Sequence, residues 1–226
     1  MLSSGDSLPG GRVICWGDNY AGQLGVPTST RDTPSSSAQP AELPADAQIE
    51  QIVASASSTC ALDRSGRVFC WGGQSDCLLG LGRSERLRAM PALVTFPTGV
   101  AIRRLSMGSF IVLAVDATGR LWTWGRGGLW LASNTSSSGS SCDGLRDDAG
   151  VPYRAGTLNP VEADWFGSRR FLDVAAGYQH ACAIDTDQGV WCWGQVIPLG
   201  GSALADSGVD MRVAYVGSLT GNLSCP

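Results

Sequence analysis

The residues best suited to chemistry in this 226-residue sequence are eight cysteines and a single histidine, His180. A single histidine excludes metal sites built from several histidines. No serine or cysteine nucleophile with a matching acid is evident, so we expect His180 to be structural. Asp147 and Asp148 lack the ligand spacing of a calcium loop, and we expect the carboxylates of Glu162 and Asp164 to be solvated. The sequence therefore predicts a protein that is not an enzyme and that holds no metal and no cofactor.

Four of the cysteines recur in pairs with one spacing. Cys60 precedes Cys70 by ten residues, and Cys182 precedes Cys192 by ten. In an intervening copy of the same segment both positions change together, to leucine and threonine. Residues directly opposite each other on antiparallel strands can bring their Cβ atoms close to disulfide range. The spacing predicts the disulfides Cys60–Cys70 and Cys182–Cys192, with buried free thiols as the alternative.

The other four cysteines lack this spacing. Cys15 has no partner ten residues upstream, and Cys225 has no strand after it, so each supplies the half of a hairpin that the other lacks. This predicts a Cys15–Cys225 bond that closes a ring. Spacing leaves open whether Cys77 and Cys142 pair. Disulfides indicate an oxidising compartment, here extracellular or in the cell envelope. The start of the chain does not resemble a signal peptide, which suggests a fragment or a processed form.

An internal repeat must position these side chains. Its first element ends in Trp-Gly and occurs four times, as GRVICWG (11–17), GRVFCWG (66–72), GRLWTWG (119–125) and GVWCWG (189–194). A second element precedes three of these copies, as IVASASSTCALD (52–63), LSMGSFIVLAVD (105–116) and VAAGYQHACAID (174–185), and VGSLTGNLSC (216–225) is a looser copy. A third element, a proline followed by apolar residues, occurs at 40–43, 91–94 and 160–163.

The first two elements together predict a hairpin with a three-residue loop. Asp63 then lies opposite Arg67, and Asp116 opposite Arg120, as modest ion pairs across the strands. The strands are apolar on both faces, which is typical of sheets covered on both sides. We therefore predict an all-β fold, a β-propeller of antiparallel blades with four repeats, either a closed four-blade ring or part of a larger ring. The propeller spans 11–226, after a disordered segment 1–10 and with an insertion at about 126–160.

The motifs GQLG (22–25), AAGYQHACAI (175–184) and G-x-V-x-C-W-G closely resemble the regulator of chromosome condensation repeat. The resemblance runs from residue 11 to about 225 and implies a β-propeller, usually of seven blades, whereas four repeats are visible here. The cysteine-bearing form is similar to a secreted bacterial branch of that family. The GQLG turn is intact only in the first copy. The histidine two residues before the cysteine survives only as His180, since Ser58 and Ile111 hold the matching positions.

The charge balance narrows the possible partners. Sixteen basic and 20 acidic side chains leave a net charge of −4, which argues against a nucleic-acid groove and a polybasic membrane surface. No apolar run is long enough to span a membrane. We expect a non-enzymatic binding scaffold that recognises an unknown protein or surface ligand through propeller loops. The resemblance keeps two alternatives open: a secreted inhibitor of the β-lactamase inhibitor type, and guanine-nucleotide exchange with chromatin binding as in the nuclear branch.

Aromatic side chains are the candidate binding residues. The Trp-Gly tryptophans recur at one structural position, so we expect Trp16, Trp71, Trp124 and Trp193 to form core between blades. Long loops on rigid scaffolds often carry binding function, which draws attention to the aromatic residues around the insertion. The candidates are Tyr20, Trp130, Tyr153, Trp165, Phe166 and Tyr178.

Overall fold

A computed structural model of the chain describes residues 12–27, 35–73, 77–82, 87–126, 157–178, 180–194 and 214–218. The described residues form four antiparallel sheets, here called sheets I to IV in chain order. Sheet I contains β1 (Ile14–Gly17) and β2 (Ser35–Pro40), and sheet II contains β3 (Ile49–Ala54), β4 (Ser58–Asp63), β5 (Val68–Gly73) and β6 (Leu87–Leu93). Sheet III contains β7 (Ile102–Met107), β8 (Ile111–Asp116), β9 (Leu121–Gly125) and β10 (Thr157–Glu162). Sheet IV contains β11 (Phe171–Ala176), β12 (His180–Asp185), β13 (Gly189–Gly194) and β14 (Ala214–Ser218).

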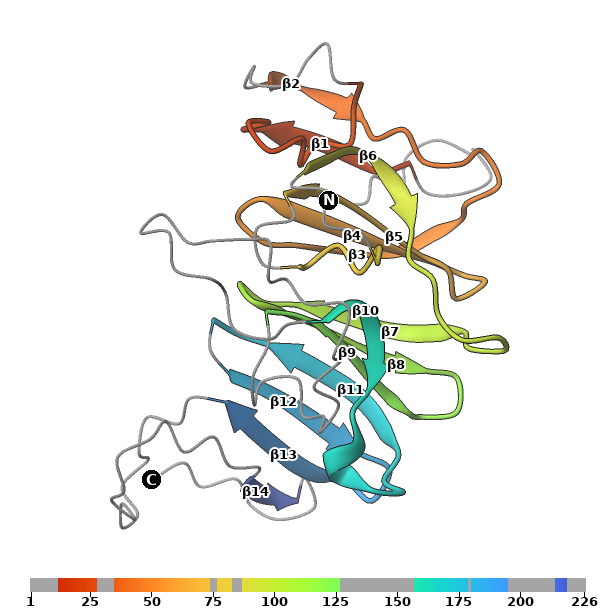
Figure 1. The fold of residues 1–226 in the computed structure, drawn as a ribbon, viewed down its shortest axis with the longest axis vertical. Helices are drawn as coiled ribbons and strands as arrows, with labels where there is room; N and C mark the ends of the chain where they lie inside the picture. Colours follow the sequence, from red (N-terminus) through yellow and green to blue (C-terminus); the bar gives the residue numbers. More distant parts are fainter. Residues whose placement is uncertain are drawn as a thin grey trace.

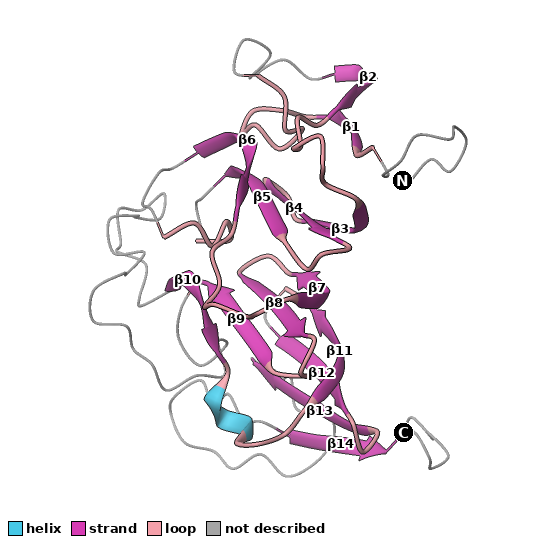
Figure 2. Ribbon diagram, turned by 90° about the vertical axis from the view of Figure 1, so that its right-hand side faces the viewer, coloured by secondary structure: helices cyan, strands magenta, loops and turns pink. Residues whose placement is uncertain are grey.

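The sheets are stacked in chain order, as blades of a propeller are (Figure 1). Sheets II, III and IV each pair four strands in consecutive order, which confirms the predicted antiparallel β-propeller fold. Sheet I and sheet IV lie at opposite ends of the stack, so the described sheets form an open arc and not a closed ring (Figures 1 and 2). Within the described residues sheet I contains two strands, and β1 and β2 correspond to the third and fourth strands of the complete sheets.

Two segments take places that the repeat pattern does not predict. Residues 214–218 pair with β13 as the fourth strand of sheet IV, so the start of VGSLTGNLSC is not a copy of the second element. Residues 157–162 form β10 and pair with β9, so the predicted insertion ends before Thr157. The 3₁₀ helix η4 (Asp164–Phe166) then leads into sheet IV. The proposed disordered segment 1–10 lies outside the described residues.

Alternation along the strands explains the apolar patterns, because successive side chains point to opposite faces of a sheet. We call the face that packs on the preceding sheet the backward face and the other the forward face. Trp71, Trp124 and Trp193 lie on backward faces and are at most 1% exposed, as expected for core between blades. Each belongs to the apolar cluster that joins its sheet to the preceding one. Trp16 differs, since 54% of its surface is exposed.

The glycine of each Trp-Gly pair is the last or the last but one residue of its strand. Gly72 and Gly125 have φ of +105° and +127°, in the range that favours glycine. A Cβ atom at Gly72 would lie 2.3 Å from the Ser57 carbonyl oxygen, and one at Gly125 would lie 2.4 Å from that of Phe110. Both carbonyls belong to turns between the first and second strands. We call this end of the sheets the glycine end; only glycine fits there because the backbones approach so closely.

The opposite end carries the hairpin turns between the second and third strands, each beginning with a buried aspartate. Asp116 accepts hydrogen bonds from the backbone N–H and hydroxyl of Thr118, from Nε of Arg120 at 2.8 Å, and from Nε1 of Trp122 at 3.0 Å. The Asp63 carboxylate is 1% exposed and accepts from Arg67 Nε at 2.7 Å. The predicted ion pairs across the strands are confirmed, but they are more than modest pairs, because each carboxylate is buried and organises a turn.

Protonation of these carboxylates is expected to lower stability in acid. Burial raises the pKa of the Asp63, Asp116 and Asp185 carboxyls, but the hydrogen bonds outweigh it and hold all three pKa values below the ordinary value. A pKa lower in the folded chain than the unfolded value of about 3.9 gives stabilisation that is complete above that value. It is lost as pH falls through the folded pKa. Urea unfolding measured from about pH 7 down to pH 2 should therefore show the free energy of unfolding falling below about pH 4. A flat profile over that range would contradict this account.

Candidate protein-interaction surface

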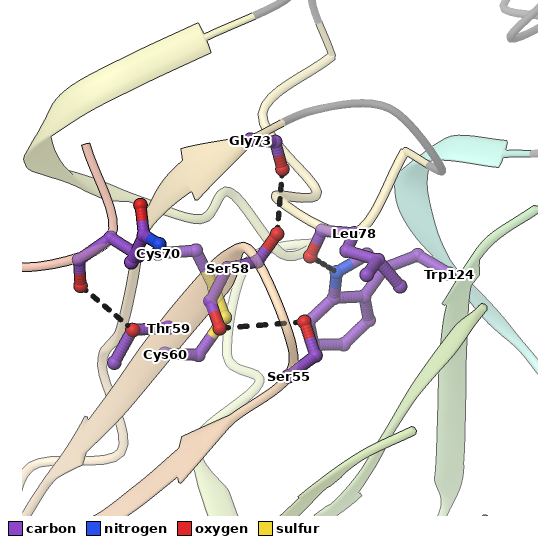
Figure 3. The surroundings of a disulfide bond; sticks show 9 residues. Ser55, Ser58, Thr59, Cys60, Cys70, Gly73, Leu78 and Trp124 are labelled. Atoms are coloured by element: carbon purple, nitrogen blue, oxygen red, sulfur yellow. Dashed lines mark hydrogen bonds between the residues drawn. A yellow bond between two sulfur atoms is a disulfide. The ribbon is translucent and has the colours of Figure 1, made fainter. Parts of the chain in front are cut away.

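The two predicted hairpin disulfides are present. Cys60–Cys70 has an S–S distance of 2.03 Å and Cys182–Cys192 one of 2.09 Å, and the register places each pair directly opposite. Figure 3 shows the first bridge close to Trp124, whose Nε1 donates to the carbonyl oxygen of Leu78 at 2.8 Å. The bridges therefore lie within the sheets and hold the scaffold.

The other cysteine predictions have different outcomes. Cys15 is a free, half-buried thiol, so the predicted Cys15–Cys225 bond is absent. Its strand, β1, pairs among the described residues only with β2, and no strand occupies the edge where Cys60 stands in sheet II. Burial raises the pKa of the Cys15 thiol. Cys77 is disulfide-bonded, whereas Cys142 and Cys225 lie outside the described residues, so the Cys77–Cys142 pairing stays a prediction.

His180 begins β12 and is exposed. A Cβ atom at Gly177 would lie 2.5 Å from Cε1 of His180, so the imidazole covers that glycine. Within the described part of the chain, no group of three His, Cys, Asp or Glu residues is placed to hold a metal ion. There is also no helix long and apolar enough to cross a membrane among the residues described.

The predicted aromatic residues separate into exposed and buried groups. Tyr20 and Tyr178 are exposed over 56% and 62% of their surface. Phe166 is buried, with its ring centroid 5.1 Å from that of Trp193, and Trp165 is partly buried against the same cluster. The structure therefore corrects the expectation that Phe166 is an exposed anchor. It lies in η4, which packs onto sheet IV. Trp130 and Tyr153 lie outside the described residues.

Tyr178 belongs to a cluster that bridges two sheets at the glycine end. It lies in the turn between β11 and β12, and its ring centroid is 5.1 Å from that of Phe110 in the turn between β7 and β8. The guanidinium of Arg126, just after β9, lies 5.0 Å from the Phe110 ring centroid. We call Phe110, Arg126 and Tyr178 the aromatic patch. Phe110 and Arg126 were not predicted from the sequence. A signal for Phe110 was present, because the matching turn of sheet II has only small residues (55–57) whereas the turns of sheets III and IV each carry an aromatic residue.

Trp16 and Tyr20 lie at the same end of sheet I. A groove of about 330 Å³ runs between β1 and sheet II and is lined on one side by Ile14, Cys15 and Trp16. On the glycine end, exposed aromatic side chains therefore lie on sheet I (Trp16 and Tyr20) and on sheet IV (Tyr178), the first and last sheets of the arc. Tyr, Trp and Arg are the residues most enriched at the energetic centres of protein interfaces. Rings fixed by adjoining strands lose little conformational freedom on binding, so the arrangement suits recognition of a protein surface.

Known proteins share both the repeat and the fold. Models of the regulator of chromosome condensation (RCC1) repeat match residues 10–62, 65–115, 49–76 and 171–195. The ultraviolet-B receptor UVR8 of Arabidopsis thaliana is 30% identical over 227 residues, covering 96% of this chain and 46% of the receptor. The mitochondrial RCC1 domain-containing protein RUG3 of the same plant is 26% identical and covers 81% of this chain and 38% of its own length. The chain therefore spans about half the length of the curated relatives it matches.

Solved structures with the same fold include Prp20p from Saccharomyces cerevisiae, with a TM-score of 0.68 at 20% identity over 93% of this chain and 47% of that one. Human WBSCR16 gives a TM-score of 0.66 at 20% identity, over 90% of this chain and 49% of that one. The matched repeats, the long alignment with a relative and the stacked four-stranded sheets lead to one conclusion. The chain belongs to the regulator of chromosome condensation repeat family.

Proposed function

We propose that the chain is a non-enzymatic scaffold that recognises a protein partner through the aromatic patch. The observation that carries the proposal is the contact between Phe110 and Tyr178, which joins two neighbouring sheets at 5.1 Å while Tyr178 remains 62% exposed. The Tyr178 side chain is held on one side by Phe110 and is exposed on the other, so it is suited to fill a pocket on a partner. Arg126 packs its guanidinium 5.0 Å from the Phe110 ring centroid, and arginine is enriched beside aromatic residues at interface centres.

The solved relatives support a protein as the partner. The Prp20p structure is described together with binding to Gsp1p and histones, and another yeast structure of the family was solved bound to Kap60. At 20–21% identity these structures share the fold with this chain, so the identity of its own partner does not follow from theirs. The net charge of −4 favours a protein over a nucleic acid as the ligand.

The disulfides bear on the compartment in which the protein acts. Two bridges in matching positions persist in oxidising compartments, so we place the protein outside the cytoplasm, in the extracellular space or the cell envelope. The same bridges weigh against the nuclear exchange role considered from sequence. The β-lactamase inhibitor role is one form of the proposed recognition, with the enzyme as partner.

The aromatic patch is tested by one substitution within it and by a control substitution of a side chain with similar exposure. Partners captured from the extracellular and envelope proteins of the source organism are purified, and the dissociation constant of each is measured. Tyr178→Ala should raise it at least tenfold, because truncating an interface anchor costs about 1.4 kcal/mol or more. Leu93→Ala removes a side chain that is 52% exposed in sheet II and should change the constant less than twofold.

Equal affinities for the wild-type chain and Tyr178→Ala would overturn the assignment of the patch. The absence of any saturable partner would overturn the proposed function itself.

A further inference from the structure

The hairpin turns at the end opposite the glycine end share one arrangement of three side chains. The aspartate that begins the turn binds the arginine four residues later, and this arginine lies over the aromatic ring six residues after the aspartate. In sheet III, Arg120 Nε lies 2.8 Å from Asp116 Oδ2, and the guanidinium carbon lies 5.3 Å from the Trp122 ring centroid. In sheet II, Arg67 repeats both contacts, at 2.7 Å from its aspartate and 5.4 Å from the centroid of its aromatic ring.

Sheet IV has the aspartate and the aromatic ring, but its turn lacks the arginine. Gly189 stands four residues after Asp185, where the other two turns carry arginine. The place of that arginine is taken by Arg169, which comes from a different segment. Its Nη1 lies 3.1 Å from Asp185 Oδ2, and its guanidinium carbon lies 4.0 Å from the Trp191 ring centroid. Asp185 Oδ2 also accepts a hydrogen bond from Trp191 Nε1 at 2.7 Å, as the matching aspartate does in sheet III. The group of three side chains is therefore completed from outside the hairpin.

From this exchange of one arginine for another we infer that Arg169 is a latch, which holds the connector between sheets III and IV (residues 163–170) closed on the turn of sheet IV. An arginine within a turn binds only its own hairpin, whereas Arg169 and Asp185 are 16 residues apart and belong to different segments. The Asp185 side chain is 3% exposed, and removing one partner from a buried ion pair is strongly unfavourable. Release of the connector breaks this pair, so the pair favours the closed connector.

The closed connector also covers part of the core between sheets III and IV. It contains η4 (cyan in Figure 2), whose Phe166 packs on Trp193 with ring centroids 5.1 Å apart. Two backbone hydrogen bonds lie beside the latch: the Thr186 N–H donates to the Arg170 carbonyl oxygen at 2.8 Å, and the Phe171 N–H donates to the hairpin turn of sheet III at 2.8 Å. Opening of the connector would break the first of these bonds and uncover the Phe166 ring. Amide hydrogen exchange therefore reports whether the connector is open.

Hydrogen exchange followed by mass spectrometry tests the latch on the whole chain. Arg169→Ala should raise the exchange rates of the protected amides in residues 163–170 and 185–189 at least tenfold. Arg120→Ala is the matched control, because it removes the arginine of a turn that is complete by itself. It should speed exchange in residues 116–120 and leave the preceding connector (94–101) within twofold. Unchanged rates in residues 163–170 for Arg169→Ala overturn the inference. If thermal unfolding shows that Arg169→Ala does not fold, Arg169→Lys replaces it and should raise the same rates at least threefold, because an ammonium lacks the planar group that binds Asp185 and stacks on Trp191 together.

A second substitution separates completing the turn from holding the connector. Gly189→Arg, added to Arg169→Ala, returns an arginine to the position that it has in the other turns. The φ of Gly189 lies outside the range that favours glycine, so its backbone accepts an arginine. The double variant should recover slow exchange in residues 185–189 but not in residues 163–170. Recovery in both segments would show that other contacts hold the connector, which overturns the latch. Recovery in neither would show that residue 189 does not match the arginine position, which overturns the comparison on which the inference rests.

Discussion

Trp124→Ala is expected to lower the free energy of unfolding by about 3–5 kcal/mol, the range for truncating a large buried aromatic side chain. Trp124 is 0% exposed and joins sheet III to sheet II. Its Nε1 donates to the Leu78 carbonyl oxygen at 2.8 Å, and its ring packs edge-on against Phe96 with centroids 5.9 Å apart. The substitution therefore leaves a cavity between two sheets and an unpaired buried carbonyl. Urea unfolding followed by far-ultraviolet circular dichroism measures the loss.

Trp16→Ala is the matched control for this substitution. It removes the same side chain at the same position of the repeat, but 54% of the Trp16 surface is already exposed. We expect a change in the free energy of unfolding within about 0.5 kcal/mol, as is usual for surface substitutions. If both variants lost a similar free energy of unfolding, the stabilisation by these tryptophans would depend on their position in the repeat and not on packing between sheets.

Asp116→Ala is expected to cost about 3 kcal/mol or more, because it removes one partner from a buried, charge-assisted network. The carboxylate is 1% exposed and receives hydrogen bonds from Thr118, Arg120 and Trp122, so its loss leaves several donors unpaired. The Arg120 guanidinium, which lies 5.3 Å from the Trp122 ring centroid, also loses its anchor. Chemical unfolding at neutral pH measures the change.

Asp46→Ala is the control, because it removes a carboxylate that is also paired with an arginine but is exposed to water. The Asp46 carboxylate receives a hydrogen bond from Arg67 at 2.8 Å, but its side chain is 71% exposed, so the pair is screened by water. We expect a loss below about 1 kcal/mol. A loss for Asp116→Ala no larger than that for Asp46→Ala would show that the turn does not depend on its buried carboxylate.

Much of the fold was predictable because the repeat imposes the same local geometry several times. The spacing of Cys60 and Cys70 places them opposite each other on a hairpin, and the structure pairs them in that register. Strands that are apolar on both faces indicated sheets stacked on both sides, and β5 is buried along its whole length. These features follow from short-range rules, since alternation and loop length act within about fifteen residues.

The candidate surface was only partly predictable. Of the residues predicted to take part in binding, Tyr20 and Tyr178 are exposed, whereas Phe166 is buried because η4 places it against Trp193. The pairing of Phe110 with Tyr178 joins residues 68 positions apart (178 − 110) in different sheets. A sequence pattern assigns a ring to a strand or turn, but contact between two turns depends on how the sheets pack.

The repeat, the hairpins and the two hairpin disulfides could be predicted from the sequence alone, because each depends on residues close along the chain. Which copy of a repeated position is buried could not be predicted in this way, because it depends on how the sheets pack against one another. Trp16 and Trp71 share one motif, but a tryptophan is covered only when another sheet lies before its own. Cys15 is a free thiol for a related reason, since no strand of the described part of the chain pairs with β1 on the edge where β4 meets β5. A side chain is buried only where another part of the structure packs on it, and this depends on how the sheets are arranged in space.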